Sequence, residues 1–270
     1  MPQASFVRFK RSLFFMMKRK SQRITFENGR GQTLSGILEM PEGEVHQFAL
    51  FSHCFTCTKD LKATVRISRR LAEHGIGVLR YDFTGLADSE GDFSETNFTT
   101  NCQDFLAAAD FLQQDFQPPS LLIGHSLGGT ATAVMANQIE SAKAVVTIAS
   151  PSSTERLAGF LDKSCPAIAL EGAGIVNIGG FDFTLKKQLL DDLLSHDIEA
   201  LVSQLKLPIL IFHSPEDATL PYTWGIKMFD SVASPKSFVT LPDSDHLLVK
   251  RREDVLYVAD LIHLWATRYL

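Results

Sequence analysis

Short apolar runs alternate with longer segments of helical periodicity along most of this 270-residue chain. A short apolar run is typical of a buried strand, and apolar residues three and four apart are typical of a helix that packs on a sheet. The alternation predicts an α/β domain with a mostly parallel sheet and helices on both of its faces. Strands are expected at residues 47–54, 76–83, 121–124, 143–150, 207–214 and 236–242, and helices at 59–75, 100–116 and from about 251 to the end.

Two parts of the chain depart from this alternation. Residues 24–41 predict two strands joined at Asn28-Gly29, a hairpin that opens the sheet. Between residues 151 and 207 the strand signals lapse, and apolar residues from Leu185 to Leu205 recur at helical spacing. We expect residues 24–270 to form one domain, with a helical insertion at about 151–207 that caps a pocket. Packing of the insertion on the edge of the sheet is the alternative.

Positive charge is concentrated at the start of the chain. The whole chain has a formal net charge of −5, which does not suggest a nucleic-acid-binding protein. Residues 1–23 carry seven Lys or Arg and no acidic residue, and we expect them to form a disordered tail. Two alternatives stay open: a true start at Met16 or Met17, so that residues 1–16 are not natural, and weak contact of the basic tail with an anionic membrane surface.

Cysteine content and hydropathy indicate the compartment. Four cysteines are too few for a disulfide scaffold, no secretory signal accompanies them, and no apolar run is long enough to span a membrane. We therefore expect a cytoplasmic protein. The sequence does not indicate an oligomeric state.

A serine motif lies where one of the expected strands ends. Residues 124–128, Gly-His-Ser-Leu-Gly, match the pattern G-x-S-x-G, in which a sharp strand-to-helix turn exposes a serine hydroxyl. The pattern alone recurs by chance in a chain of this length in about one case in ten. Here an apolar strand precedes it and small residues typical of a helix follow it. Ser126 is therefore the candidate nucleophile.

A serine nucleophile needs a base, and the base needs an acid that orients it. In the chain order Ser, acid, His, the candidate base is His246, in a loop after the last expected strand. The candidate acid is Asp217, in the loop after the strand at 207–214, because a short side chain in a turn fixes an imidazole tightly. The other residues considered are the histidines His196, His213 and His263 and the acids Glu216, Asp243 and Asp245.

The oxyanion of an acyl-transfer reaction needs two backbone N–H donors. Leu127 offers one at the start of the expected helix, where the helix dipole adds a favourable potential. The second is expected from the loop after the strand at 47–54, where Phe55 is the candidate. Nucleophile, base, acid and oxyanion donors thus come from separate segments in the right order, which is much less expected by chance than the serine motif alone.

These segments resemble the α/β-hydrolase superfamily over residues 24 to 270. The serine motif is similar to the family's nucleophile elbow, "HSPEDATLP" is similar to its acid loop, and "DSDHLL" to its histidine loop. The resemblance implies the α/β-hydrolase fold, with a twisted sheet of about eight strands and a cap insertion.

Two other segments narrow the resemblance. "HCFTCTKD" and "LRYDFTGLADSEGDF" resemble bacterial hydrolases that are often fused to an OsmC-type domain, which these 270 residues do not include. His53-Cys54-Phe55 stands where many members have His-Gly-X, which supports Phe55 as an oxyanion donor. Two positions depart from the pattern: Cys54 replaces the usual glycine, and Ala87 stands where many relatives have the second glycine of D-x-x-G-x-G-x-S.

Cys54 and Cys57 form a C-x-x-C motif just before an expected helix, a spacing that suits reversible disulfide formation. Oxidation of the pair would distort the loop that carries Phe55. A redox-responsive sensor or binding protein is therefore the alternative to an enzyme. The simpler interpretation is that Cys54 packs as a small apolar residue and Cys57 is incidental.

Taken together, these residues predict a serine hydrolase that acts through an acyl-enzyme on carboxyl esters of small or medium acyl groups. We expect a small ester-like substrate, no nucleic-acid partner, no cofactor and no metal. Thioesters, peptides and other cofactor-free reactions are the alternatives, because one fold supports several chemistries.

Overall fold

The computed structural model describes residues 18–270. Its main feature is an eight-stranded sheet in the order β1-β2-β4-β3-β5-β6-β9-β10. The pairs β1–β2 and β2–β4 are antiparallel, and the other neighbouring pairs are parallel. This confirms the predicted α/β class with a mostly parallel sheet. The strands are β1 (Arg19–Glu27), β2 (Thr33–Pro41), β3 (Gln47–Ser52), β4 (Ile76–Tyr81), β5 (Leu121–His125), β6 (Ala144–Ile148), β9 (Ile209–His213) and β10 (Lys236–Thr240).

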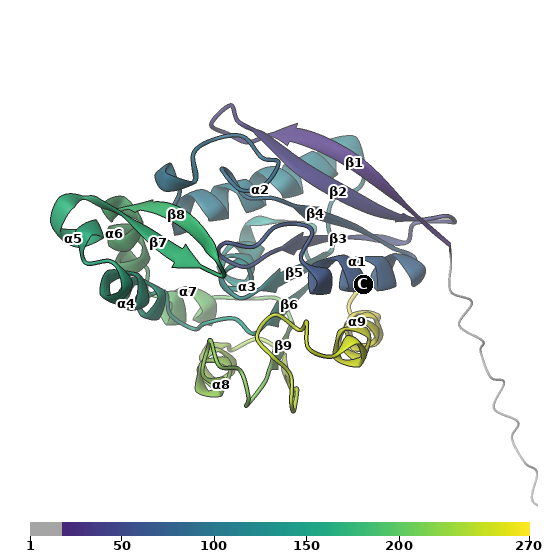
Figure 1. Ribbon diagram of the computed structural model, residues 1–270. Helices are drawn as coiled ribbons and strands as arrows, with labels where there is room; N and C mark the ends of the chain where they lie inside the picture. The colour runs from purple at the N-terminus through teal and green to yellow at the C-terminus, as the bar shows by residue number, and fades with distance from the viewer. Residues whose placement is uncertain (1–17) are drawn as a thin grey trace, which may run out of the picture.

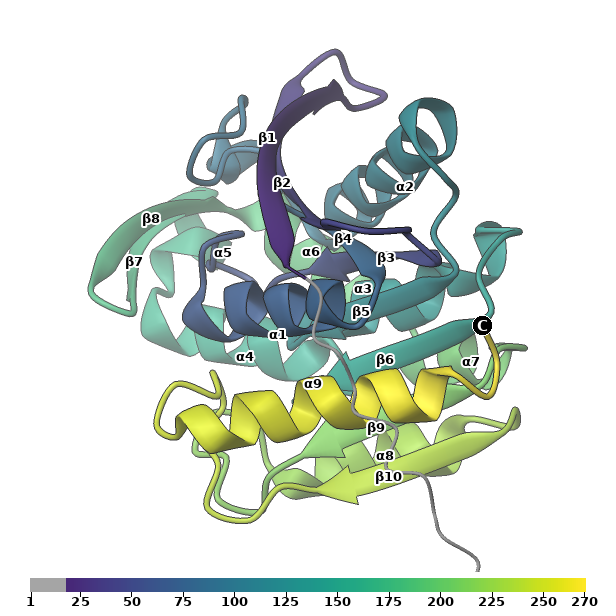
Figure 2. The same cartoon turned by 90° about the vertical axis from the view of Figure 1, so that its right-hand side faces the viewer.

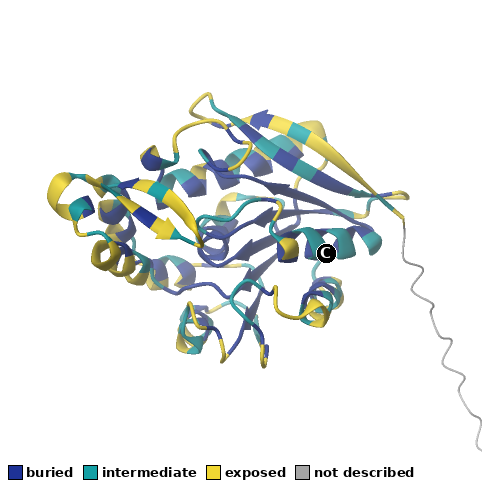
Figure 3. Cartoon of the chain, viewed as in Figure 1, coloured by how far each residue is buried: buried dark blue, intermediate teal, exposed yellow. Residues whose placement is uncertain are grey.

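Helices cover both faces of the sheet. α1 (Lys62–Glu73) and α9 (Arg252–Ala266) lie side by side on one face, as Figure 2 shows. α2 (Phe98–Asp115), α3 (Leu127–Met135) and α8 (Tyr222–Ser231) lie on the other face (Figure 1). Figure 3 shows the central strands buried along almost their whole length, because both of their faces are covered. Burial of these apolar faces stabilises the fold by about 25 cal/mol for each Å² removed from water.

Local sequence signals set the ends of α2, which crosses the sheet next to the serine motif. Asn97 accepts a hydrogen bond from the N–H of Thr100, and the hydroxyl of Thr100 accepts one from the N–H of Asn97, which forms a capping box. Pro118 and Pro119 follow the helix and cannot continue it. The chain then enters β5 directly.

The expected basic tail is shorter than predicted. Residues 1–17 lie outside the described residues, so the membrane contact and the alternative start stay predictions. Residues 19–23 were expected to be disordered, which is wrong, because they form the first half of β1 and pair with residues 37–41 of β2. Their charged side chains point mostly to solvent, which is common on an edge strand.

The insertion after β6 lies at the carboxyl ends of the parallel strands (Figures 1 and 2). It was expected to be helical, yet residues 173–186 form a β-hairpin, and Leu185 lies in a strand rather than in a helix. Gly179 and Gly180, both with positive φ, make the turn, and a Gly-Gly pair between apolar runs is the signal that was missed. The elements are α4 (Glu155–Ser164), α5 (Ala167–Glu171), β7 (Ala173–Ile178), β8 (Phe181–Lys186), α6 (Lys187–Ser195) and α7 (Ile198–Ser203).

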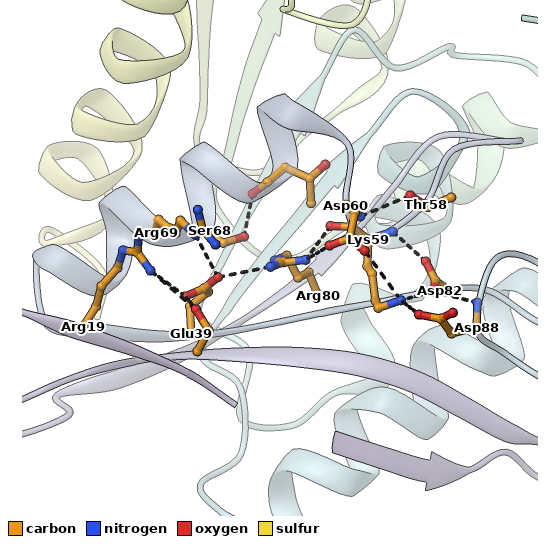
Figure 4. A network of polar contacts seen from close by, with 12 residues as sticks. Arg19, Glu39, Thr58, Lys59, Asp60, Ser68, Arg69, Arg80, Asp82 and Asp88 are labelled. Carbon is orange, nitrogen blue, oxygen red and sulfur yellow. Dashed lines mark hydrogen bonds and ion pairs between the residues drawn. The ribbon is translucent and has the colours of Figure 1, made fainter. Parts of the chain in front are cut away.

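A series of ion pairs and hydrogen bonds, buried except for Asp88, connects the sheet to the loop between β3 and α1 (Figure 4). Glu39 of β2 accepts a hydrogen bond from Arg80 of β4, and Arg80 also donates to the carbonyl of Lys59 in the loop, 2.7 Å away. The Lys59 ammonium lies 2.6 Å from Asp82 and 2.7 Å from Asp88. Burial alone would lower the pKa of Lys59, but the hydrogen bonds to these two carboxylates raise it, so the lysine stays charged. The loop is therefore fixed from the side of the sheet.

Candidate active site

The serine motif forms a tight turn between β5 and α3. β5 ends at His125 and α3 begins at Leu127, so Ser126 alone connects them. Its φ of 53° and ψ of −127° lie in a region that residues with a side chain rarely adopt. The N–H of Ser126 donates to the carbonyl of Ile148 at the end of β6, 2.8 Å away, which holds the turn against the neighbouring strand.

The glycines of the motif are required by close packing. A Cβ atom on Gly124 would overlap the backbone of Gly128 and Gly129, and one on Gly128 would overlap the carbonyl oxygen of His53. The start of α3 therefore lies directly against the loop that follows β3. This contact brings the serine and the predicted oxyanion loop together.

The three side chains predicted to react lie in hydrogen-bonding contact. Nε2 of His246 is 3.1 Å from Oγ of Ser126, and Nδ1 of His246 is 2.7 Å from Oδ2 of Asp217. The Asp217 side chain is fully buried and the His246 side chain is 10% exposed. Water therefore has little access to either hydrogen bond.

The protonation states follow from the surroundings of Asp217. Burial would raise the pKa of this carboxyl, but the hydrogen bond from His246 and those from the N–H groups of Leu220 and Thr219 bring it below its ordinary value. An ionised carboxylate only accepts hydrogen bonds, so Nδ1 of His246 donates to it. Nε2 then has a free lone pair toward the Ser126 hydroxyl and is able to take its proton.

The other candidate acids make different contacts. Glu216 accepts a hydrogen bond from the N–H of Asp243, 3.0 Å away, and Asp243 itself is largely exposed. Asp245 accepts from the N–H groups of residues 249 and 250, which shapes the histidine loop. Of the other candidate histidines, His196 lies beside Asp192 in the insertion and His263 lies within α9. His213, at the end of β9, lies 3.7 Å from Asp217.

The loop after β3 carries the second predicted oxyanion donor. The N–H of Phe55 makes no hydrogen bond to any of residues 18–270. Leu127 is the first residue of α3, where N–H groups have no partner within the helix. Cys54 is not among the described residues with positive φ, so its backbone conformation is one that residues with a side chain commonly adopt. Ala87, by contrast, has a φ of 46°, the conformation that glycine favours.

Cys54 and Cys57 are joined by a disulfide, and the N–H of Cys57 donates to the carbonyl of Cys54. The pair closes a turn with Phe55 inside it, so Cys57 is not incidental to the structure of this loop. Cys102 and Cys165 are free. Within residues 18–270 no group of His, Cys, Asp and Glu side chains is arranged to hold a metal ion.

Aromatic rings connect the loop after β3 to the insertion. Phe55 packs against Phe93 with ring centroids 5.6 Å apart, and Phe93 packs against Phe183 of β8 at 5.3 Å. All three side chains are half-buried. The hairpin of the insertion thus has an apolar connection to the turn that carries the predicted oxyanion donor.

Buried histidines end or follow three of the parallel strands around Ser126. His53 follows β3 and lies 2.7 Å from the carbonyl of Cys54, His125 ends β5, and His213 ends β9 and lies 3.1 Å from the carbonyl of Leu220. Burial is the main reason that the pKa of each ring lies below its ordinary value. Each ring is therefore neutral at pH 7.

Sequence reasoning did not assign a role to His125, nor to the ion pair of Lys59 and Asp82. His125 occupies the variable position of G-x-S-x-G, so the motif does not specify it. Lys59 and Asp82 are 23 positions apart, and only their places just beyond β3 and directly after β4 indicate that they meet.

Comparison with known proteins places this chain among hydrolases. Residues 57–173 match the family described as serine aminopeptidase, S33. The crystal structure of the esterase domain from a Rhodothermus marinus protein is 38% identical, with a TM-score of 0.74 over 93% of this chain and 99% of that chain. Est1E from Butyrivibrio proteoclasticus, with ferulic acid bound, is similar in fold, with a TM-score of 0.76 and 20% identity over 91% of this chain and 98% of that chain.

Curated relatives match a smaller part of this chain. Lysophosphatidylserine lipase ABHD12 from Danio rerio is 28% identical over 200 residues, which are 71% of this chain and 49% of the relative. An uncharacterized protein, YfhR from Salmonella typhimurium, is 28% identical over 66% of this chain and 57% of its own length. The chain thus spans about half the length of the curated relatives it matches. Among residues 18–270, no helix combines the length and the apolar character that crossing a membrane requires.

Proposed function

Because this chain belongs to the α/β-hydrolase superfamily, we propose that it is a serine hydrolase that cleaves carboxyl esters through an acyl-enzyme. The observation that carries the proposal is the hydrogen-bonded series from Asp217 through His246 to Ser126, with distances of 2.7 and 3.1 Å. A sensor or binding protein on this fold has no need of a complete series, so the series favours an enzyme.

In the first half of the proposed reaction, Nε2 of His246 takes the proton of the Ser126 hydroxyl as Oγ attacks the ester carbonyl carbon. The Asp217 carboxylate stabilises the imidazolium that forms. The N–H groups of Phe55 and Leu127 donate to the oxyanion of the tetrahedral intermediate, an interaction for which one donor is typically worth about 10²–10³ in rate. His246 then gives its proton to the departing alcohol oxygen, and the carbonyl re-forms as an acyl ester of Ser126.

In the second half, water takes the place of the alcohol. His246 accepts a proton from the water as its oxygen attacks the acyl carbon, and then returns a proton to Oγ of Ser126. The acid leaves and the enzyme is restored. Every proton in the cycle passes through His246, so no metal or organic cofactor enters the scheme.

Two observations favour an apolar acyl or alcohol group in the substrate. The half-buried rings of Phe55, Phe93 and Phe183 line the connection between the predicted oxyanion loop and the insertion. The Rhodothermus marinus protein is described as an esterase domain, and ABHD12 as a lipase of lysophosphatidylserine. An ester with an apolar acyl group is the substrate class that agrees with both, and we propose a small or medium acyl chain.

Hydrolysis of p-nitrophenyl esters from acetate to dodecanoate tests the proposal. We expect the wild type to hydrolyse part of the series, with an optimum that reports the size of the acyl site, and Ser126→Ala to lose the activity while remaining folded. Activity that persists in Ser126→Ala would contradict the serine mechanism. Labelling of the wild type by a fluorophosphonate provides an independent measure of nucleophile activation, and Ser126→Ala is its control.

Peptide hydrolysis is the second candidate, because the matching family is described as a serine aminopeptidase. The same nucleophile and base would attack an amide, with His246 protonating the amine that leaves. Aminoacyl p-nitroanilides, measured beside the esters, separate the two. A kcat/KM for an anilide above that for every ester would make the peptide the preferred substrate.

A further inference from the structure

His125 joins the two residues that exchange the proton in the proposed reaction. It is the residue directly before Ser126, and its ring is 3% exposed at the end of β5. Nε2 of His125 lies 2.7 Å from the backbone carbonyl oxygen of His246, and the two rings have centroids 5.2 Å apart. The nucleophile is thus linked to the base by one peptide bond and one hydrogen bond.

The direction of this hydrogen bond is fixed by its surroundings. The carbonyl of His246 only accepts, so Nε2 of His125 carries the hydrogen and donates it. Burial, together with the neighbouring His246, lowers the pKa of His125 to about 3, so the ring is neutral. Nδ1, which is then unprotonated, is buried and has no hydrogen-bond partner among residues 18–270. The ring therefore contributes one donor, and that donor is used on the histidine loop.

The histidine loop needs such support. It runs from β10 to α9 without regular structure, and two of its residues, Asp243 and Leu248, have positive φ of 59° and 52°. Asp217 accepts a hydrogen bond from Nδ1 of the His246 ring, which orients the ring but does not fix the backbone of His246. The side chain of His125 instead holds that backbone, through its hydrogen bond to the carbonyl of His246.

We propose that His125 is a positioning residue, which sets the distance between Ser126 Oγ and His246 Nε2 by holding the backbone of His246. This inference rests on the proposed serine mechanism. Because a displacement of about 1 Å in a reacting group costs on the order of 100-fold in rate, loss of this bond affects the chemical step more than substrate binding.

Two substitutions at one position test the proposal. His125→Phe keeps a ring of similar shape without a donor, and His125→Gln keeps an N–H that reaches where Nε2 was. On the best p-nitrophenyl ester we expect His125→Phe to lower kcat by about 10- to 100-fold with KM changed by less than about 2-fold. His125→Gln is expected to recover most of kcat. Thermal unfolding of both variants shows that each one is folded.

A double substitution shows whether the effect passes through His246. In the His246→Ala background, His125→Phe is expected to leave the slow fluorophosphonate labelling of Ser126 unchanged, whereas in the wild-type background it slows labelling. A kcat for His125→Phe equal to that of the wild type would overturn the inference, and so would equal losses in His125→Phe and His125→Gln.

The proposed function is tested separately by the wild type and Ser126→Ala. If the wild type is active and Ser126→Ala is not, a wild-type kcat in His125→Phe overturns only the positioning role. If the wild type neither hydrolyses the esters nor reacts with the fluorophosphonate, the proposed function fails and this inference fails with it.

Discussion

The carbonyl oxygen of His53 lies so close to Gly128 that a Cβ atom at that position would overlap it. The contact joins the loop after β3 to the first turn of α3, which carry the two proposed oxyanion donors. Displacing either partner is energetically unfavourable, because the atoms in contact belong to the backbone at His53 and to the Gly128 position. The ring of His53 is also hydrogen-bonded to the N–H of Phe83 and to the carbonyl of Cys54. The glycine therefore sets the spacing between the two donors.

Gly128→Ala is expected to destabilise the protein by about 1–3 kcal/mol, the cost of inserting a methyl group into a packed site. It is also expected to lower kcat, because the two backbones must separate. Urea unfolding and ester kinetics measure the two effects. Gly159→Ala is the matched control, since nothing lies within 4 Å of a Cβ there and α4 gains about 0.8–1 kcal/mol of helix propensity. A Gly128→Ala enzyme as stable and active as the wild type would contradict the contact.

Asp217→Asn is expected to lower kcat by about 10³- to 10⁴-fold with little loss of stability. The amide NH₂ of asparagine would donate to Nδ1 of His246, which leaves the hydrogen on Nε2, where it faces Ser126 and prevents uptake of the serine proton. Ester hydrolysis by the purified variant measures this.

Glu216→Gln is the control for Asp217→Asn, because Glu216 lies in the same loop and accepts hydrogen bonds from Ser214 and from the N–H of Asp243. We expect it to change kcat little. Comparable losses in the two variants would mean that the acid loop as a whole, rather than the Asp217 carboxylate, supports the activity.

The sequence predicts most of the sheet because most of the parallel strands are short, predominantly apolar runs with a turn at their end. The meeting of Ser126, Asp217 and His246 follows from the same property, since the carboxyl ends of β5, β9 and β10 reach one edge of the sheet. Strand alternation and chain order thus contain enough information to place these three residues near one another.

Contacts between distant side chains are less accessible to sequence reasoning. The hydrogen bond from His125 to the carbonyl of His246 joins positions 121 apart. Every residue has a backbone carbonyl, so the residue type at position 246 does not indicate this acceptor. The hairpin of β7 and β8 was missed because Leu185 is in phase with the leucines of α6, so helical spacing was extended backward across Lys187. Tertiary pairing with β7 decides the conformation of that segment.

The disulfide predicts the thiol count of the protein. Under denaturing conditions we expect two thiols, from Cys102 and Cys165, four after reduction, and three in Cys57→Ser. The reduced protein is expected to keep most of its esterase activity, because the ion pair of Lys59 with Asp82 and the hydrogen bond of His53 to Cys54 also hold the loop. Activity that is lost on reduction and restored by mild peroxide would instead show that the disulfide controls the loop that carries Phe55, and Cys57→Ser would then lack the response.

Stability is expected to fall as the pH drops below about 6.5. The pKa values of His53, His125 and His213 lie below the ordinary value of 6.5, chiefly through burial. The unfolded chain takes up protons on these rings near pH 6.5 while the folded protein does not, so their contribution is complete above that pH and is lost progressively toward the folded pKa values. Each ring removes up to about 1.4 kcal/mol of unfolding free energy per pH unit, and only between pH 6.5 and its own folded pKa.

Urea unfolding at several values between pH 7.5 and pH 5 measures this slope. The lowered pKa values of Asp217 and Glu39 act in the same direction but only below their unfolded values of 3.8 and 4.5, so the histidines account for the loss above pH 5. His213→Gln keeps a donor for the carbonyl of Leu220 but does not titrate, and it is expected to reduce the slope by up to about 1.4 kcal/mol per pH unit. An unfolding free energy that is constant from pH 7.5 to pH 5 would show that the buried rings take up protons in the folded state.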